Sequence, residues 1–167
     1  MVSMYEITVP PLVLALNNLA HILKVGKRNA DARKIDHGVY LNGRLAPDMY
    51  PLTRQVQIAT DMSKGAGARL AGLDVPSYQD TETTFEELLT RIDKTIQFLE
   101  SIAPEKFEGA ETRHIELMVR DSKREFVGLD YLLRWVKPNV YFHVTTTYSI
   151  LRHFGVELGK RDFLGPK

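Results

Sequence analysis

His143 is the side chain in this sequence with the greatest scope for chemistry. It lies in the segment 141–148, where Thr146 and Thr147 follow it by three and four residues. In a helix these spacings place side chains on one face, so an imidazole and two hydroxyls would lie together. The imidazole can bind a metal or act as a general base beside a water held by Thr147. Alternatively, it can donate a hydrogen bond to a carbonyl or a threonine hydroxyl inside the fold, and the residues leave both interpretations open.

A second group of polar side chains accompanies an apolar helix pattern. Asp61 follows Gln57 by four residues and precedes Lys64 by three, which gives a polar stripe along one helix. If the stripe faces solvent, its charges are ordinary surface groups. If it faces the helix that carries His143, then Gln57, Asp61 and His143 form a polar pocket with mixed oxygen and nitrogen donors. One carboxylate and one imidazole make a sparse metal site.

The other histidines favour structural roles. No two histidines are four residues apart, as they are in a His-Glu-x-x-His zinc motif. His153 ends a predicted helix, where a cation interacts favourably with the helix dipole. His21 borders an apolar stripe, and His37 and His114 lie in connecting segments where exposure is expected.

Composition excludes several classes of function. The 167 residues contain no cysteine, so any metal must use His, Asp or Glu. Twenty-two Lys and Arg against twenty-one Asp and Glu leave a charge of +1, which indicates neither nucleic acid nor an anionic membrane as a partner. The sequence has no phosphate-binding glycine loop, nucleophile elbow or dinucleotide fingerprint. The apolar stretch 9–20 is too short to span a bilayer, so we expect a cytoplasmic protein.

Four amphipathic patterns predict the helices that position these side chains. Each begins at a proline or a capping residue and ends at or before an asparagine, a glycine or a proline. Their expected bounds are 10–29, with Pro10 and Pro11 opening the helix, 51–72, 85–103 and 138–155. The connection 30–51 is expected to contain at most one short helical turn.

The segment between the third and fourth helices has strand periodicity. Ile115, Leu117 and Val119 alternate with charged or ambiguous residues, and 125–129 can pair with them around a turn at 121–123. The sequence therefore predicts a mainly α fold in one domain over residues 1–167. Its architecture is a four-helix bundle with a small β-hairpin insertion between helices three and four.

Five segments of the chain resemble a known family: Leu45–Leu52, Gln55–Gln57, Ala68–Gly72, Asn139–His143 and Ile150–His153. Together they are similar to the DUF1993 family of bacterial proteins of unknown function, which is grouped with the DinB-like (YfiT-like) four-helix bundles. The resemblance covers nearly the whole chain and implies a DinB-like bundle.

The resemblance also implies a site and a partner. DinB-like relatives commonly bind a divalent metal through one histidine on the second helix and two histidines four residues apart on the fourth. Some are thiol S-transferases, and many form dimers. Here His143 matches the first histidine of the fourth-helix pair, Thr147 stands where the second is expected, and the second helix contains none. The resemblance thus implies a homodimer. It also implies an incomplete set of metal-binding histidines, in which His143 is the ligand for zinc, nickel or manganese.

Two functions follow from these observations. In the first, the bundle keeps a degenerate metal or small-molecule site between its second and fourth helices, formed by His143, Thr147, Asp61 and Gln57. In the second, it is a non-catalytic dimeric scaffold or binding module, and the same residues are structural hydrogen-bond partners. Whether the protein is an enzyme stays open, and the sequence identifies no substrate.

Overall fold

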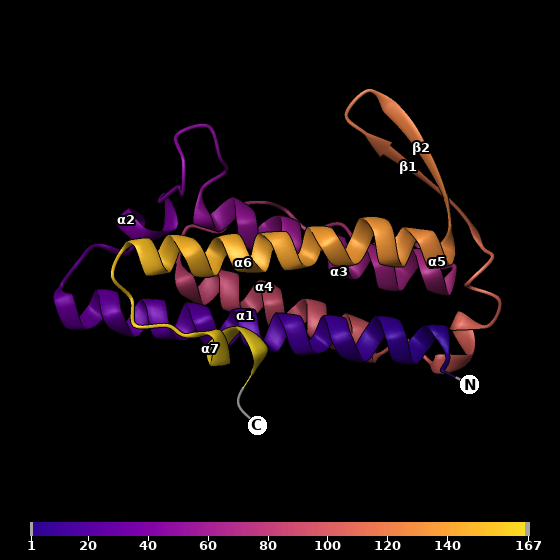
Figure 1. The fold of residues 1–167 in the computed structure, drawn as a ribbon, viewed down its shortest axis with the longest axis horizontal. Helices are drawn as coiled ribbons and strands as arrows, with labels where there is room; N and C mark the ends of the chain where they lie inside the picture. The colour runs from indigo at the N-terminus through magenta and orange to yellow at the C-terminus, as the bar shows by residue number, and fades with distance from the viewer. Residues whose placement is uncertain (1, 166–167) are drawn as a thin grey trace.

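The computed structural model describes residues 2–165, and within that range four long helices pack along one another (Figure 1). These helices are α1 (Met4–Arg33), α3 (Leu52–Ala71), α4 (Phe85–Glu100) and α6 (Lys137–His153). The shorter elements are α2 (His37–Leu41), η1 (Pro104–Phe107), β1 (His114–Val119), β2 (Ser122–Val127), α5 (Gly128–Asp130), η2 (Tyr131–Val136) and α7 (Lys160–Leu164). The predicted bundle with a hairpin between its third and fourth long helices is confirmed.

The start of α1 differs from the prediction. Ser3 Oγ accepts a hydrogen bond from the Glu6 amide at 3.2 Å, and the Glu6 carboxylate accepts one from the Ser3 amide at 2.7 Å. This capping box starts the helix at Met4. Pro10 and Pro11 therefore lie inside α1 rather than opening it. Each proline removes one amide donor, a cost that the buried apolar stripe of the helix outweighs.

α1 is also the helix with the most apolar sequence. By length and composition alone it could cross a membrane, with a mean hydropathy of 1.2 over its most apolar window. Half of that window is buried inside the bundle, where Leu12, Leu16 and Leu19 expose at most 1% of their surface. Within residues 2–165, α1 is thus a core helix that packs against α4, α6 and α7.

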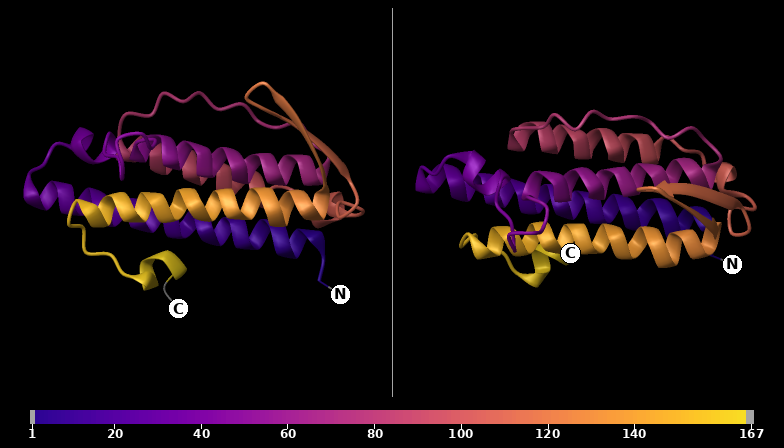
Figure 2. Two further views of the ribbon diagram at one scale, coloured as in Figure 1. Left: turned by 45° about the horizontal axis from the view of Figure 1, so that its top comes forward. Right: turned by 90° about the horizontal axis from the view of Figure 1, so that it is seen from above.

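The connection between α3 and α4, residues 73–83, is long and extended. α3 ends at Gly72, whose φ of +69° is left-handed, as its predicted capping role requires. The connection then runs back along the bundle to the start of α4 (Figure 2), so α3 and α4 run parallel. The two helices pack closely, because a Cβ on Gly67 would lie 2.6 Å from a methyl carbon of Leu99.

The hairpin extends from one end of the bundle (Figure 1). Its two strands are antiparallel, and its register pairs Ile115 with Phe126 and Glu116 with Glu125. One face packs on the bundle: Ile115 is 4% exposed, and the Phe126 ring lies 5.7 Å from that of Trp135. The turn is shorter than predicted, because Arg120 takes a left-handed φ of 53° and Ser122 already pairs with Val119.

The last long helix, α6, starts at Lys137, one residue before the predicted Pro138, but helical backbone already begins at Gly128, ten residues before that proline. α5, η2 and α6 follow one another without a break, and η2 is a π-helical segment. Pro138 has no amide donor and its ring crowds the preceding turn, which a widened segment accommodates. At the end of that segment the Asn139 side-chain amide donates to the Trp135 carbonyl at 2.6 Å.

Candidate functional site

His143 lies on the side of α6 that packs against α3. Its side chain is buried, with 8% of the residue exposed, and its Nδ1 lies 2.6 Å from Oε1 of Gln55. The Gln55 amide nitrogen donates to the Tyr50 carbonyl at 3.0 Å, which fixes the orientation of that amide. Since Gln55 Oε1 can only accept, Nδ1 must carry the proton. The α3–α6 contact therefore selects one tautomer of the imidazole.

The other ring nitrogen, Nε2, is left with its lone pair. This nitrogen makes no hydrogen bond within residues 2–165. In that range two side-chain polar atoms are fully buried without a partner, Thr8 Oγ1 and Trp135 Nε1, and Nε2 of His143 is not one of them. Solvent therefore reaches it. Burial, and secondarily the Arg54 guanidinium, lower the pKa of His143 to about 4. At neutral pH the ring is uncharged and presents one acceptor.

The threonines near His143 use their hydroxyl protons within their own helix. Thr147 donates to the His143 carbonyl at 3.0 Å, and Thr146 donates to the Phe142 carbonyl at 2.8 Å. Such bonds to the preceding turn are common for threonine in helices. Thr147 is thus beside His143 in the sequence-predicted position, with only its oxygen lone pairs available.

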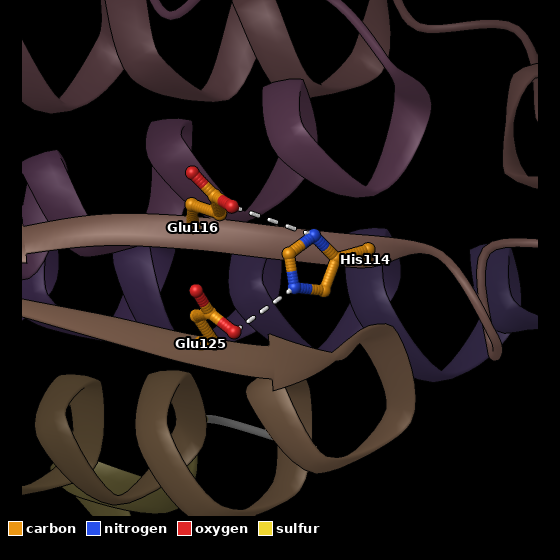
Figure 3. A group of neighbouring side chains, drawn as sticks. All are labelled: His114, Glu116 and Glu125. Carbon is orange, nitrogen blue, oxygen red and sulfur yellow. Dashed lines mark ion pairs between the residues drawn. The ribbon is translucent and has the colours of Figure 1, made fainter.

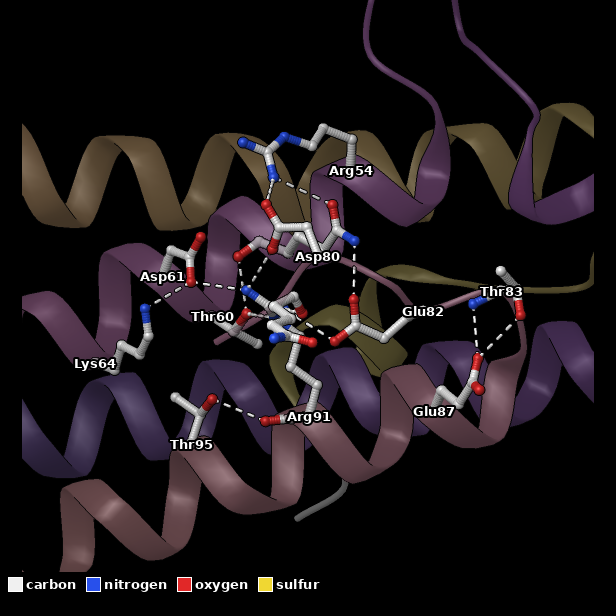
Figure 4. A network of polar contacts seen from close by, with 12 residues as sticks. Arg54, Thr60, Asp61, Lys64, Asp80, Glu82, Thr83, Glu87, Arg91 and Thr95 are labelled. Atoms are coloured by element: carbon white, nitrogen blue, oxygen red, sulfur yellow. Dashed lines mark hydrogen bonds and ion pairs between the residues drawn. The ribbon is translucent and has the colours of Figure 1, made fainter. Parts of the chain in front are cut away.

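Gln57 and Asp61 contact different neighbours from His143, and Figure 4 shows Asp61 with its partners Lys64 and Arg91. Gln57 Nε2 donates to Glu82 Oε2 at 2.9 Å, and Asp61 Oδ1 accepts from Lys64 at 2.7 Å and from Arg91 at 2.8 Å. The pocket expected to contain Gln57, Asp61 and His143 is therefore not formed. The reason is helical phase: Gln55 and Gln57 are two residues apart, roughly 200° around the helix, so only Gln55 faces α6.

The sequence analysis missed Arg91, which organises the other side of α3. Its side chain is 2% exposed and forms ion pairs with Asp61, Asp80 and Glu82 at 2.8, 3.0 and 2.9 Å. It also donates to Thr60 Oγ1 at 2.8 Å and to the Gln79 carbonyl at 3.1 Å. Burial alone would lower the pKa of Arg91, but these carboxylates more than offset it and the pKa is raised. One signal was available: Arg91 falls within the apolar stripe of its helix, directly before Ile92.

The Arg91 contacts hold the 73–83 connection on the bundle. Asp80 and Glu82 belong to that connection, while Arg91 comes from α4 and Asp61 from α3. Arg54 of α3 adds an ion pair to Asp80. Hollows of about 470 and 310 Å³ flank the connection, and Glu82 lines both. Because the charged groups between α3 and α4 are already paired, this region has the character of a structural clamp.

The donors around His143 do not fit a three-histidine metal site. His143 offers Nε2, but Gln55 Oε1 already accepts from Nδ1, and the Thr147 hydroxyl is a neutral, weak ligand. Asp61, the carboxylate expected to join them, is bound by Arg91 and Lys64. One imidazole nitrogen without a carboxylate or a second imidazole is a poor ligand set for zinc, nickel or manganese.

Comparison with known proteins places the chain in a family. A family model described as "Domain of unknown function (DUF1993)" matches residues 4–164. The chain belongs to the DUF1993 family. This DUF1993 protein also resembles a solved structure, a crystal structure of a DinB family member from Shewanella denitrificans. The two sequences are 40% identical, the match covers 98% of this chain and 93% of the other, and the TM-score is 0.92. No curated protein matches the chain.

The comparisons confirm the resemblance found in the sequence segments. The protein is a DinB-like bundle of the DUF1993 family. Neither match specifies a reaction, a ligand or a partner for that family.

Proposed function

We propose that this DUF1993 protein is a small-molecule binding module whose site is the Nε2 face of His143 at the α3–α6 contact. The observation that carries this proposal is the bond from Nδ1 to Gln55, which leaves Nε2 as an uncharged acceptor that solvent reaches. The ligand chemistry that fits is a hydrogen-bond donor, such as a hydroxyl or an amide N–H. In this role Gln55 positions the ring, Gln57 holds the 73–83 connection through Glu82, and Asp61 pairs with Arg91.

The acidity of His143 favours binding over catalysis. A general base works best when its pKa lies near the working pH, and the pKa of His143 is lowered to about 4. At neutral pH such a ring accepts a hydrogen bond but holds a transferred proton weakly. We therefore propose a binding function without general-base chemistry and, on the donor set, without a bound metal at this position.

Chemical modification tests whether Nε2 is available. Diethyl pyrocarbonate acylates unprotonated imidazole, so at about pH 5, where an ordinary histidine of pKa about 6.5 is mostly charged, His143 should remain reactive. Mass spectrometry should find His143 modified at that pH. An unmodified His143 at every pH would show that Nε2 is closed to ligands and would overturn the proposal.

A ligand screen then tests the binding itself. Small alcohols, polyols and amides are added to ¹⁵N-labelled protein, and amide shifts are compared between wild type and H143F, which keeps an aromatic ring but has no nitrogen. The proposal predicts shifts at residues of α3 and α6 in wild type that H143F loses. Elemental analysis of the untagged protein accompanies the screen, and stoichiometric metal that H143F removes would contradict the metal-free proposal.

A second candidate function is the dimeric scaffold, which has its own supporting observation. Exposed apolar side chains gather where α1, α6 and α7 meet, with Leu14 55% and Leu164 57% exposed beside Tyr141. An apolar hollow of about 340 Å³ lies among them. We propose this face as the contact of a cytoplasmic homodimer. Light scattering should give a dimer mass that L14E halves, whereas a monomeric wild type would exclude it.

A further inference from the structure

The outward face of the hairpin carries a cluster of metal-ligand side chains outside the site described above. The register places Glu116 directly opposite Glu125, and His114 lies two residues before Glu116 on the same face. A ring nitrogen of His114 and one carboxylate oxygen from each glutamate lie within 4.8 Å of one another. Figure 3 shows both carboxylates beside the imidazole, and all three side chains are exposed.

This arrangement has an electrostatic cost that a cation must offset. Two carboxylates directly opposite each other destabilise a pair of strands. Lys123 Nζ lies 2.8 Å from Glu116 Oε1 and 2.9 Å from Glu125 Oε1, and these contacts raise the pKa of Lys123 to about 12. His114 Nδ1 lies 3.8 Å from Glu116 Oε1, and its Nε2 lies 3.6 Å from Glu125 Oε2. The two carboxylates already converge on one cation.

We propose that His114, Glu116 and Glu125 bind a divalent ion of the zinc type, which displaces the Lys123 ammonium. One imidazole nitrogen with two carboxylate oxygens suits zinc, whereas calcium and magnesium prefer oxygen ligands throughout. Ligand atoms around a tetrahedral zinc, at bonds of about 2.1 Å, lie roughly 3.4 Å apart. Exposed side chains whose ligand atoms lie within 4.8 Å of one another can reach that spacing by rotamer changes alone.

The bound ion would join the two strands. Glu116 and His114 come from β1, while Glu125 comes from β2, so one ion bridges the ribbon at the pair where its charges repel. With three protein ligands, the remaining coordination positions are filled by water. This site is independent of His143, which lies on α6, so either proposal can fail without the other.

Isothermal titration of the full-length untagged protein with zinc chloride at neutral pH tests the inference. Wild type should bind one zinc ion per chain. H114A should weaken binding by at least about tenfold, since even removal of a group that only supports a ligand costs metal sites about that much. K123Q should strengthen binding, because the competing ammonium is gone, and H143F should bind as wild type does.

Each alternative outcome is decisive, because H143F is the only one of the three variants that changes a buried residue. Absence of zinc binding in both wild type and K123Q would show that the cluster is only a set of ion pairs. Equal affinity in wild type and H114A would exclude the hairpin site. Loss of binding in H143F with retention in H114A would assign the zinc to the bundle and overturn the inference. Thermal melts of each variant without zinc serve as the folding control.

Discussion

The two sides of α3 bury polar groups in contrasting ways. Toward α6, one amide meets one imidazole, and the result is a single uncharged hydrogen bond from His143 to Gln55. Toward α4, the guanidinium of Arg91 meets three carboxylates from α3 and the 73–83 connection. The crowded side leaves its charges paired with one another, while on the sparse side Nε2 of His143 makes no hydrogen bond within residues 2–165. Of these two sides, the one proposed as the ligand site is thus the one with fewer polar groups.

Removal of Arg91 should give the largest effect. R91A leaves Asp61, Asp80 and Glu82 together without their central cation, and breaking a buried ion-pair group in this way costs about 3–5 kcal/mol. Urea unfolding measures the loss. R134A is the matched control, because the Arg134 side chain is 78% exposed and its change should stay within about 0.5 kcal/mol. Similar losses of unfolding free energy in R91A and R134A would show that the ion pairs of Arg91 are not a structural clamp, and the contrast with the His143 side of α3 would disappear.

The pH dependence of stability should isolate His143. Its pKa is about 4 in the folded protein and about 6.5 when unfolded, so the unfolded chain binds the additional proton below pH 6.5. Stability from this group is complete above pH 6.5 and is lost as the pH falls toward 4, by about 3 kcal/mol in total. Unfolding curves of wild type and H143Q across that range should therefore converge on acidification. Parallel curves would show that the ring is not desolvated.

Replacement of Gln55 should give a smaller effect that is confined to the α6 side. Q55L leaves the Nδ1 proton of His143 and the Tyr50 carbonyl without their partner, which costs about 1–3 kcal/mol for a buried unpaired group. Long-range ¹H–¹⁵N spectra of the imidazole should also lose the pure Nδ1–H tautomer. Q57L is the control two residues away, and it should leave the His143 spectrum unchanged. A tautomer shift in Q57L would mean that the two sides of α3 are coupled.

The sequence was sufficient to predict the helices and the hairpin, but it was not sufficient to predict which side chains of different elements contact one another. Apolar periodicity gave four helices, and alternation at Ile115, Leu117 and Val119 gave the hairpin, because both signals are local. The predicted start of α1 at Pro10 and Pro11 was wrong, because the capping box at Ser3 and Glu6 starts the helix earlier. Prolines and capping boxes are both visible in the sequence, so their effects on a helix start can be compared before the structure is known.

The site required information that spacing does not contain. The stripe through Gln57 and Asp61 was read correctly as one helix face, but periodicity does not say which helix that face meets. The choice depends on Arg91, a charged residue in an apolar stripe whose partners, Asp80 and Glu82, come from a connection without regular structure. The role of Gln55 could be assigned only when α6 was placed beside it.

The π-helical segment Tyr131–Val136 rotates one end of the last helical stretch relative to the other end. A π turn holds one residue more than the α-helical spacing, which offsets everything beyond it by about 100° around the axis. The hairpin joins this helical stretch at Gly128, and His143 lies beyond the π-helical segment, so the segment sets the rotation of one about the helix axis relative to the other. Deletion of one residue from this segment would rotate the hairpin about the helix axis to a different side of the bundle. The imidazole of His143 would stay against Gln55.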